Sequence, residues 1–294
     1  MQEENERIGN YEVLQHIADG AFGRVFLVRH WFLQDRLYAM KLLHTKRLQN
    51  TREQKRFMQE AQFLGMLHHP HIPYIHDIGV DGDGTPYIVL EYAPNGSLRD
   101  LINSNAPLPM PFEQAISILS EIERALFFTH QNSVIHHDIK PENILFNSQW
   151  EAMLTDFGIA LMMESVTVRR SAATVGTPDY MAPEQYRGYA SRRSDQYSLA
   201  VMAYELFTGR VPFLANSIEE LRTMHQSKRP IPPSHFNSTL PRYIDHVILK
   251  ALEKRRINRF DDVCGFIRSL QGAPIAPARR QPVMSDTRPT IRVR

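Results

Sequence analysis

The sequence predicts an α+β protein with two lobes, a small antiparallel β-sheet that carries one helix, followed by a larger and mostly helical part. Short apolar or alternating runs bounded by turn residues fill about the first 92 residues. Helical periodicity dominates from about residue 93 and ends near residue 271. At 294 residues the chain is long enough for each lobe to bury its own core.

The strands of the first lobe are predicted from five runs. They cover residues 11–18, 24–30, 37–43, 72–80 and 86–92. The last two runs flank "DGDGT", whose glycines and aspartates are typical of a tight turn. We therefore expect an antiparallel sheet of about five strands.

One helix interrupts these strands, from Thr51 to about His68. Thr51 and Gln54 match a capping box, and apolar residues follow at helical spacing. Glu60 falls on the apolar face of this helix, where an unpaired carboxylate is costly. Lys41, in the neighbouring strand "LYAMKLL", could pair with it. The alternative is that both side chains extend along apolar surface to reach water.

The second lobe is predicted to contain several helices and one hairpin. Residues 112–132 place their apolar side chains on one face, whereas 194–209 is apolar nearly all round and should be buried. Gly209 is suited to end that helix. Further helical patterns cover 217–226, 240–253 and 261–270, and apolar runs at 144–146 and 152–155 flank the turn "NSQ".

Composition excludes several classes of protein. Apolar residues make up 43% and charged residues 22%, as in soluble globular proteins, and the net charge of +2 does not indicate a nucleic-acid partner. Cys264 is the one cysteine, so an internal disulfide and a multi-cysteine zinc site are excluded. With no signal peptide and no apolar run of about 18 residues, we expect a cytoplasmic protein.

The last segment, residues 272–294, differs from the rest. It carries five arginines, one aspartate and four prolines and shows no periodicity, so we expect a flexible tail. A solvated tail is favoured over contact with anionic lipid because its charges are widely spaced.

The stretch "HHDIKPENILF" (136–146) concentrates polar chemistry. Metal binding by His136 and His137 is disfavoured, because adjacent side chains in an extended chain point apart. The hairpin that follows should bring Asn143 and Asp156 to one end, close to Asp138. Carboxylate and amide oxygens suit Mg²⁺ and phosphate, although each residue alone would be an ordinary turn residue.

A second motif, "ADGAFGRV" (18–25), lies between two predicted strands. Gly20 and Gly23 would let backbone N–H groups approach anionic oxygens. A turn with two glycines is weak support alone, but its position ahead of Lys41 strengthens it.

Taken in order, these motifs resemble those of a eukaryotic-type (Hanks-type) serine/threonine protein kinase, with bacterial members the most similar. The resemblance covers about residues 11–270 and includes "YAMK", "VLEY", "HHDIKPEN", "DFG", "GTPDYMAPE" and "SDQYSLA". It implies the bilobal protein-kinase fold over 11–271, with lobes at 11–92 and 93–271. It also implies transfer of the ATP γ-phosphate to Ser/Thr hydroxyls of proteins, including the kinase itself.

The resemblance assigns roles to the matching positions. Lys41, oriented by Glu60, would hold the α- and β-phosphates, Asp138 would receive the substrate hydroxyl proton, and Lys140 would steady the γ-phosphate. Asn143 and Asp156 would bind Mg²⁺, with Mn²⁺ as an alternative. The other implied ATP contacts are Ala18, Gly20, Ala21, Gly23, Val25, Ala39, Leu90, Glu91, Ala93 and, through its amide, Asn143. Structural roles fall to Thr177, to a Glu184–Arg259 ion pair and to Asp195, and phosphorylation candidates are Thr167, Ser171 and Thr174.

Two departures from the family pattern stand out. Ala18 replaces the usual first glycine of the loop. His137 replaces the arginine that usually pairs with a phosphate on the activation segment. Unlike arginine, histidine is mostly neutral above about pH 7, so we expect a weaker or pH-sensitive dependence on loop phosphorylation.

The expected partners are protein substrates with Ser/Thr, together with a second copy of the chain if phosphorylation occurs in trans. We expect contact with a membrane only if the natural chain extends past the tail. Two rival interpretations are a pseudokinase and a small-molecule kinase. The complete polar set, Lys41, Glu60, Asp138, Asn143 and Asp156, argues against the first, and "MAPEQ" with the helix "SDQYSLA" argues against the second.

Overall fold

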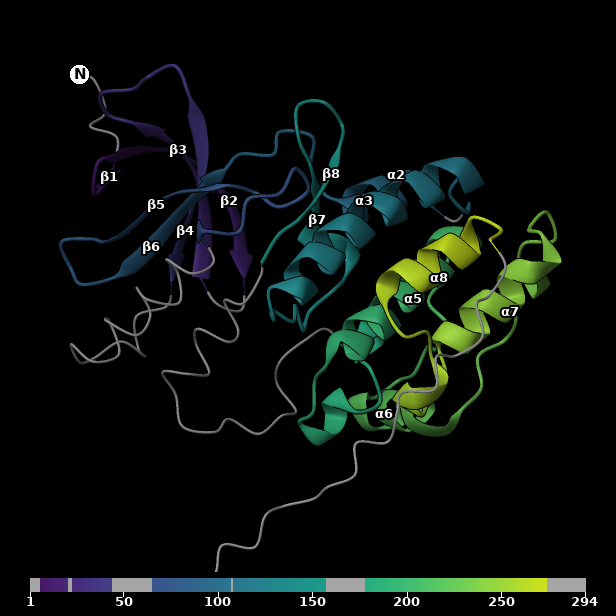
Figure 1. Ribbon diagram of the computed structural model, residues 1–294. Coiled ribbons are helices and arrows are strands. Elements are labelled where there is room, and N and C mark those ends of the chain that lie inside the picture. Colours follow the sequence, from purple (N-terminus) through teal and green to yellow (C-terminus); the bar gives the residue numbers. More distant parts are fainter. Residues whose placement is uncertain (1–5, 21–22, 44–64, 107, 157–177, 274–294) are drawn as a thin grey trace, which may run out of the picture.

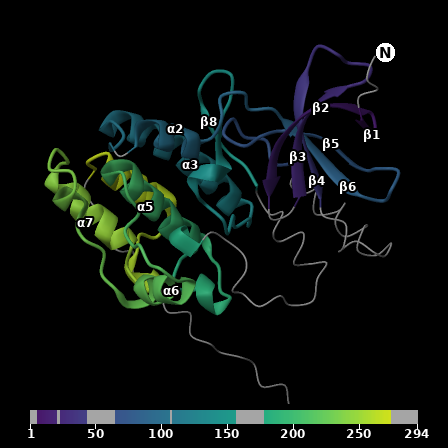
Figure 2. The same cartoon turned by 180° about the vertical axis from the view of Figure 1, so that it is seen from behind.

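The structure, a computed structural model, describes residues 6–20, 23–43, 65–106, 108–156 and 178–273. A curled sheet forms one lobe and a group of helices forms the other, as the sequence predicts (Figures 1 and 2). The predicted helix from Thr51 to His68, with Glu60, lies almost entirely outside the described residues.

The first lobe is a six-stranded sheet in the order β1-β2-β3-β4-β6-β5, and every neighbouring pair is antiparallel. The five predicted strands are confirmed, and the "DGDGT" turn joins two of them, with Gly84 at a φ of 82°. A sixth, two-residue strand was not predicted because it is too short to show a period. The strands are β1 (Arg7–Ile8), β2 (Tyr11–Gly20), β3 (Gly23–His30), β4 (Leu37–Leu43), β5 (Ile75–Val80) and β6 (Pro86–Glu91).

The two faces of this sheet differ in what they carry. Met40 of β4 lies opposite Phe26 and Val89, and these buried side chains belong to the core of the small lobe. Side chains alternate along a strand, so Lys41 belongs to the other face. One face of the sheet therefore builds the core, and the other is available to a site.

The second lobe contains the predicted helices. The predicted face of α3 is buried, and α5 is buried from Ser194 to Thr208, as its all-round apolar sequence predicted. Gly209 ends α5 in the left-handed conformation, with a φ of 73°. The helices are α2 (Leu98–Asn105), α3 (Phe112–Gln131), α5 (Arg192–Thr208), α6 (Ile218–Ser227), α7 (Arg242–Ala251) and α8 (Val263–Leu270).

Helix α2 was missed by the sequence analysis. Its signal was a capping box, because the Ser97 hydroxyl accepts from the Asp100 N–H and the Asp100 carboxylate accepts from the Ser97 N–H. The helix spans eight residues and buries only Leu98, so it shows little periodicity.

The predicted hairpin is present as β7 (Ile144–Phe146) and β8 (Ala152–Leu154). It lies between the sheet and the helices (Figures 1 and 2). The Thr155 N–H donates to the Asn143 carbonyl at 2.9 Å, so the residues on either side of the hairpin meet at its open end. Among the described segments, no helix combines the length and the apolar character needed to cross a membrane.

His225 of α6 is a buried titratable group in the larger lobe. Its side chain is fully buried, and its Nδ1 forms a 2.9 Å hydrogen bond with the Tyr197 hydroxyl of α5. Burial, together with the nearby Lys254 ammonium, lowers the pKa of His225 to about 3. The imidazole is therefore neutral in the folded protein at neutral pH.

This neutral histidine should make the fold sensitive to acid. An unfolded chain protonates histidine near pH 6.5, so between pH 6.5 and 3 the unfolded state binds more protons. The free energy of unfolding is therefore not reduced by His225 above pH 6.5, and it should fall by about 2 kcal/mol between pH 7 and pH 5. In urea titrations at both pH values, His225→Gln should remove this part of the slope, whereas His235→Gln, an exposed control, should not. An equal slope in all three proteins would contradict the assignment.

Candidate active site

The segment before β7 is anchored by Asp195 in the first turn of α5. This carboxylate is 1% exposed. Its Oδ2 accepts from the His136 N–H at 2.9 Å and its Oδ1 from the His137 N–H at 3.0 Å, while His130 Nε2 donates to Oδ2 at 2.7 Å. Burial would raise the pKa of Asp195, but the hydrogen bonds from His130 and from the backbone of His136 outweigh it and lower the pKa. An ionised carboxylate thus fixes the backbone of two consecutive residues.

His136 connects this segment to the end of the hairpin. Its Nε2 donates to the Thr155 carbonyl at 2.8 Å, and its Nδ1 accepts from the Asp138 N–H at 3.3 Å. Burial lowers the pKa of His136, so the ring is neutral and uses both nitrogens in protein hydrogen bonds. A metal-ligand role for His136 was disfavoured from the sequence, and this geometry gives no support to one.

Three predicted site residues converge just after His137. The Lys140 ammonium lies 2.9 Å from Asp138 Oδ2. The Asn143 side-chain amide donates to the Asp138 carbonyl at 2.7 Å and to Asp138 Oδ2 at 3.2 Å. Asn143 belongs to the 3-10 helix η2 (Pro141–Asn143), which leads directly into β7. Because its nitrogen faces Asp138, the Asn143 oxygen is the atom that would meet a metal.

Lys41 joins the sheet to this group. Its ammonium lies 2.8 Å from Asp156 Oδ1, although the two residues are 115 positions apart in the sequence. Lys41 is 3% exposed, so it does not extend to water as one of the two interpretations required. Its predicted partner Glu60 lies outside the described residues. Asp156 has a φ of 65°, a left-handed backbone conformation that is uncommon for a residue other than glycine.

The predicted nucleotide contacts of the sheet share the face of Lys41. Val25 lies opposite both Ala18 and Lys41 in the register. Ala39 lies opposite Leu90, two positions along β4 from Lys41, and therefore points the same way. Five side chains proposed to contact a nucleotide are thus gathered on one surface that is continuous with Asp156.

One glycine of the predicted phosphate loop, Gly23, is required by the packing of the sheet. A Cβ at Gly23 would lie 2.2 Å from the Leu42 carbonyl oxygen, so the close approach of β3 to β4 requires glycine there. Gly20, the last residue of β2, pairs with Gly23, the first residue of β3, and Ala21 lies outside the described residues.

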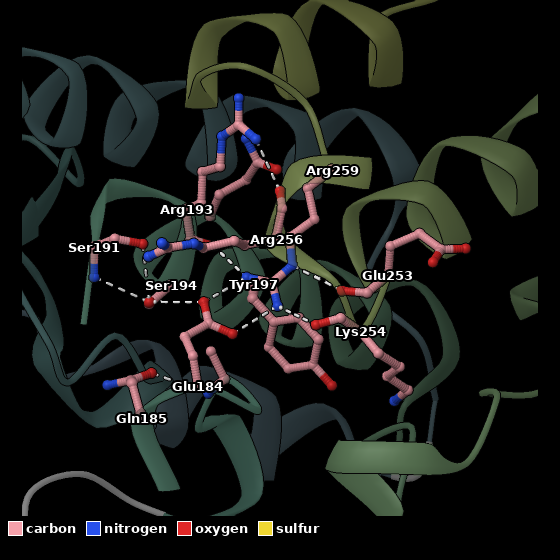
Figure 3. A network of polar contacts seen from close by, with 12 residues as sticks. Glu184, Gln185, Ser191, Arg193, Ser194, Tyr197, Glu253, Lys254, Arg256 and Arg259 are labelled. Carbon is pink, nitrogen blue, oxygen red and sulfur yellow. Dashed lines mark hydrogen bonds and ion pairs between the residues drawn. The ribbon is translucent and has the colours of Figure 1, made fainter. Parts of the chain in front are cut away.

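The structure contains the predicted ion pair between Glu184 and Arg259 (Figure 3). The two guanidinium ends contact the two carboxylate oxygens at 2.7 and 2.8 Å, and Arg259 Nε donates to the Glu253 carbonyl at 2.8 Å. The Arg259 side chain is 0% exposed and lies 4.7 Å above the Tyr197 ring. Burial acts to raise the pKa of Glu184, but hydrogen bonds and charge from Arg259 lower it below its ordinary value.

Neutralising Glu184 should be costly, because Arg259 would remain buried without a counter-charge. We expect Glu184→Gln to lower the free energy of unfolding by about 3–5 kcal/mol in urea denaturation. Asp261→Asn is the matched control, since Asp261 pairs with Arg193 at 2.9 Å on the surface and should contribute about 1 kcal/mol or less. Equal losses of unfolding free energy in the two variants would contradict the expectation that the buried Glu184–Arg259 pair contributes more to stability than the surface pair.

Several predicted residues lie outside the described part of the chain. The structure therefore gives no account of their roles. They are Ala21, Glu60, Thr167, Ser171, Thr174 and Thr177.

Sequence reasoning missed two groups that support the site. His130 falls four residues after Leu126 on the apolar face of α3, so the argument that singled out Glu60 would also have found it. Arg99 of α2 lies 2.8 Å from both Glu142 Oε1 and Glu205 Oε1 and thereby joins α2, η2 and α5. No local pattern indicates that contact, because its members are far apart in the sequence.

Comparisons with known proteins agree with this geometry. The family model described as "Protein kinase domain" matches residues 11–263. The chain is similar to the probable serine/threonine-protein kinase CPE1738 of Clostridium perfringens, with 35% identity over 266 residues, 90% of this chain and 38% of that protein. It is also similar to serine/threonine-protein kinase PrkC of Bacillus subtilis, with 35% identity over 254 residues, 86% of this chain and 39% of that one.

Further relatives come from mycobacteria. Serine/threonine-protein kinase PknB of Mycobacterium leprae is 38% identical over 255 residues, 85% of this chain and 40% of that protein. The crystal structure of the Mycobacterium tuberculosis PknI kinase domain superposes with a TM-score of 0.70 at 26% identity and covers 92% of this chain and 99% of that one. The chain spans about two fifths of the length of the curated relatives it matches.

Proposed function

The chain belongs to the protein kinase family, and from this premise we propose that residues 11–271 form an active serine/threonine kinase domain with lobes at 11–92 and 93–271. It would transfer the γ-phosphate of ATP to Ser/Thr hydroxyls of proteins and of itself. The observation that carries the proposal is the 2.8 Å ion pair between Lys41 and Asp156, which joins the sheet to the polar group around Asp138.

Protein kinases use ATP and a divalent metal ion. We propose that Asn143 and Asp156 hold Mg²⁺, with Mn²⁺ as an alternative, because an amide and a carboxylate oxygen are ligands that such ions accept. Within the described ranges no group of three or more His, Cys, Asp or Glu side chains could hold a metal. Mg²⁺ usually keeps phosphate oxygens and water among its ligands, and the ion would neutralise charge on the phosphates.

The chain's own residues would then position the reactants. The substrate hydroxyl oxygen bonds to the γ-phosphorus, its proton passes to Asp138, and the bond to the β-phosphate oxygen breaks with its electrons on ADP. Lys140, 2.9 Å from Asp138, would steady the γ-phosphate, and Lys41 the α- and β-phosphates. The Lys41 face of the sheet, including Ala18, Gly20, Gly23, Val25, Ala39 and Leu90, would cover the nucleotide.

Adenine would lie against the segment that follows β6. The Glu91 N–H already donates to the Tyr74 carbonyl at 2.8 Å. The Glu91 carbonyl and the backbone of Ala93 would therefore contact adenine, and Leu90 would lie behind it.

We also propose where the kinase acts and which partners it has. We expect it to act on proteins in the cytoplasm and to phosphorylate a second copy of itself during transient self-association. Nothing in its net charge favours a nucleic-acid partner. A membrane would be involved only if the natural chain extends past the tail.

Incubation with radiolabelled ATP and Mg²⁺ tests the proposal, with phosphosites mapped by mass spectrometry. Phosphate should appear on Ser or Thr. Lys41→Met and Asp138→Asn should each reduce transfer by about 10² or more, because each removes a contact needed mainly in the transition state. Circular dichroism should show an unchanged fold, and Lys228→Met, a surface lysine, should keep full activity. Native protein that binds ATP without transfer would support the rival interpretation, a pseudokinase.

A finer prediction concerns His137. If Thr167, Ser171 or Thr174 is phosphorylated, we expect His137 to pair with the phosphate less well than the arginine usual in the family, because an imidazole can lose its charge and a guanidinium does not. Phosphatase treatment should therefore reduce activity less at pH 8 than at pH 6.5, and His137→Arg should restore a large effect at both. A large effect in the unmodified protein, equal to that in His137→Arg and independent of pH, would refute this role.

A further inference from the structure

The backbone at His137 adopts a conformation that a non-glycine residue rarely takes. Its φ is 73°, in the left-handed region, which costs an L-residue with a Cβ free energy. Such a conformation persists only where surrounding contacts hold it. On its amide side, the contact is the hydrogen bond from the His137 N–H to Asp195 Oδ1 at 3.0 Å.

On its carbonyl side, the contact comes from Gln185, in the 3-10 helix η5 (Gln185–Arg187) and next to Glu184 (Figure 3). Gln185 is buried. Its Nε2 donates to the His137 carbonyl at 2.8 Å, and its Oε1 accepts from the Ala182 N–H at 2.9 Å. A carbonyl can only accept and a backbone N–H can only donate, so the amide has one orientation that satisfies both partners.

The carbonyl that Gln185 holds belongs to the peptide unit that leads into Asp138. The other polar group of that unit, the Asp138 N–H, points to His136 Nδ1 at 3.3 Å. Relaxing His137 toward negative φ would rotate this unit and move the Asp138 carboxylate, which Lys140 and Asn143 now contact. The amide of Gln185 opposes that rotation directly.

We infer that Gln185 is a positioning residue for phosphate transfer, which keeps the His137–Asp138 peptide in the orientation that places the Asp138 carboxylate. The inference rests on the role proposed above for Asp138. Gln185 would act through the catalytic loop without touching ATP or the protein substrate. Its effect should therefore appear in kcat and leave the KM for ATP unchanged.

Two substitutions of Gln185 test the inference. Gln185→Met keeps the length of the side chain but cannot donate to the His137 carbonyl, so kcat should fall about tenfold or more at every pH, with the KM for ATP within about twofold. In Gln185→Glu, a protonated carboxyl can donate to the carbonyl, whereas a carboxylate repels it. The kcat of Gln185→Glu relative to the unmodified protein should rise as pH falls from 8.5 to 5.5.

The assay uses the full chain, a peptide that bears a mapped autophosphorylation site, and thermal denaturation at each pH. Gln196→Met is the matched control, because Gln196 is also buried and also holds a loop, donating to the Asp262 carbonyl at 2.8 Å and accepting from the Phe260 N–H at 3.1 Å. It should lower the melting temperature and spare kcat.

Three outcomes would overturn the inference. They are a Gln185→Met kcat within twofold of the unmodified protein, a pH-independent ratio for Gln185→Glu, and equal losses of kcat in Gln185→Met and Gln196→Met. Asp138→Asn in the same assay distinguishes the proposed role of Asp138 from that of Gln185. If Asp138→Asn retains phosphate transfer, the proposed role of Asp138 is wrong. If Asp138→Asn is inactive and Gln185→Met is fully active, only the role inferred for Gln185 is wrong.

Discussion

The site depends on one buried carboxylate, that of Asp195 in the first turn of α5. It is held rigidly, because α5 is packed on all sides in the larger lobe. It receives two consecutive backbone N–H groups and one imidazole. Hydrogen bonds to an ionised acceptor contribute about 1.5–3 kcal/mol each, so together they outweigh the cost of left-handed backbone at His137. The core of the lobe thereby fixes a loop that would otherwise follow its own conformational preferences.

From that loop a continuous set of contacts leads to the sheet. His136 donates to the carbonyl of Thr155, the residue before Asp156. Asp156 in turn forms an ion pair with Lys41 of β4. The two lobes therefore meet through a cation and a carboxylate, groups that can exchange partners with a phosphate and a metal ion. An apolar contact at this point would offer no such chemistry.

The sequence predicted most of this arrangement, because the relevant contacts are local or lie on periodic elements. The hairpin brought Asn143 and Asp156 together through strand pairing alone, and the burial of α5 followed from a sequence that is apolar nearly all round. Contacts between distant segments could not be predicted, since no period or spacing relates Gln185 to His137 or Arg99 to Glu205. The partner of Lys41 is a related case. The position of Glu60 on an apolar helix face suggested Glu60 as the partner of Lys41. In the described residues the partner is Asp156. The hairpin pattern predicted that Asp156 lies near the loop, but it could not predict that Asp156 lies beside β4.

Amide hydrogen exchange at His136 and His137, observed by NMR in the unmodified protein and in Asp195→Asn, would show whether the Asp195 carboxylate holds this loop. If the Asp195 carboxylate holds this loop, both amides should exchange as slowly as those in the middle of α5. The same amides should exchange much faster in Asp195→Asn, while the α5 amides stay protected. Exchange at the rate of exposed loop amides in the unmodified protein, or no change in Asp195→Asn, would contradict the claim.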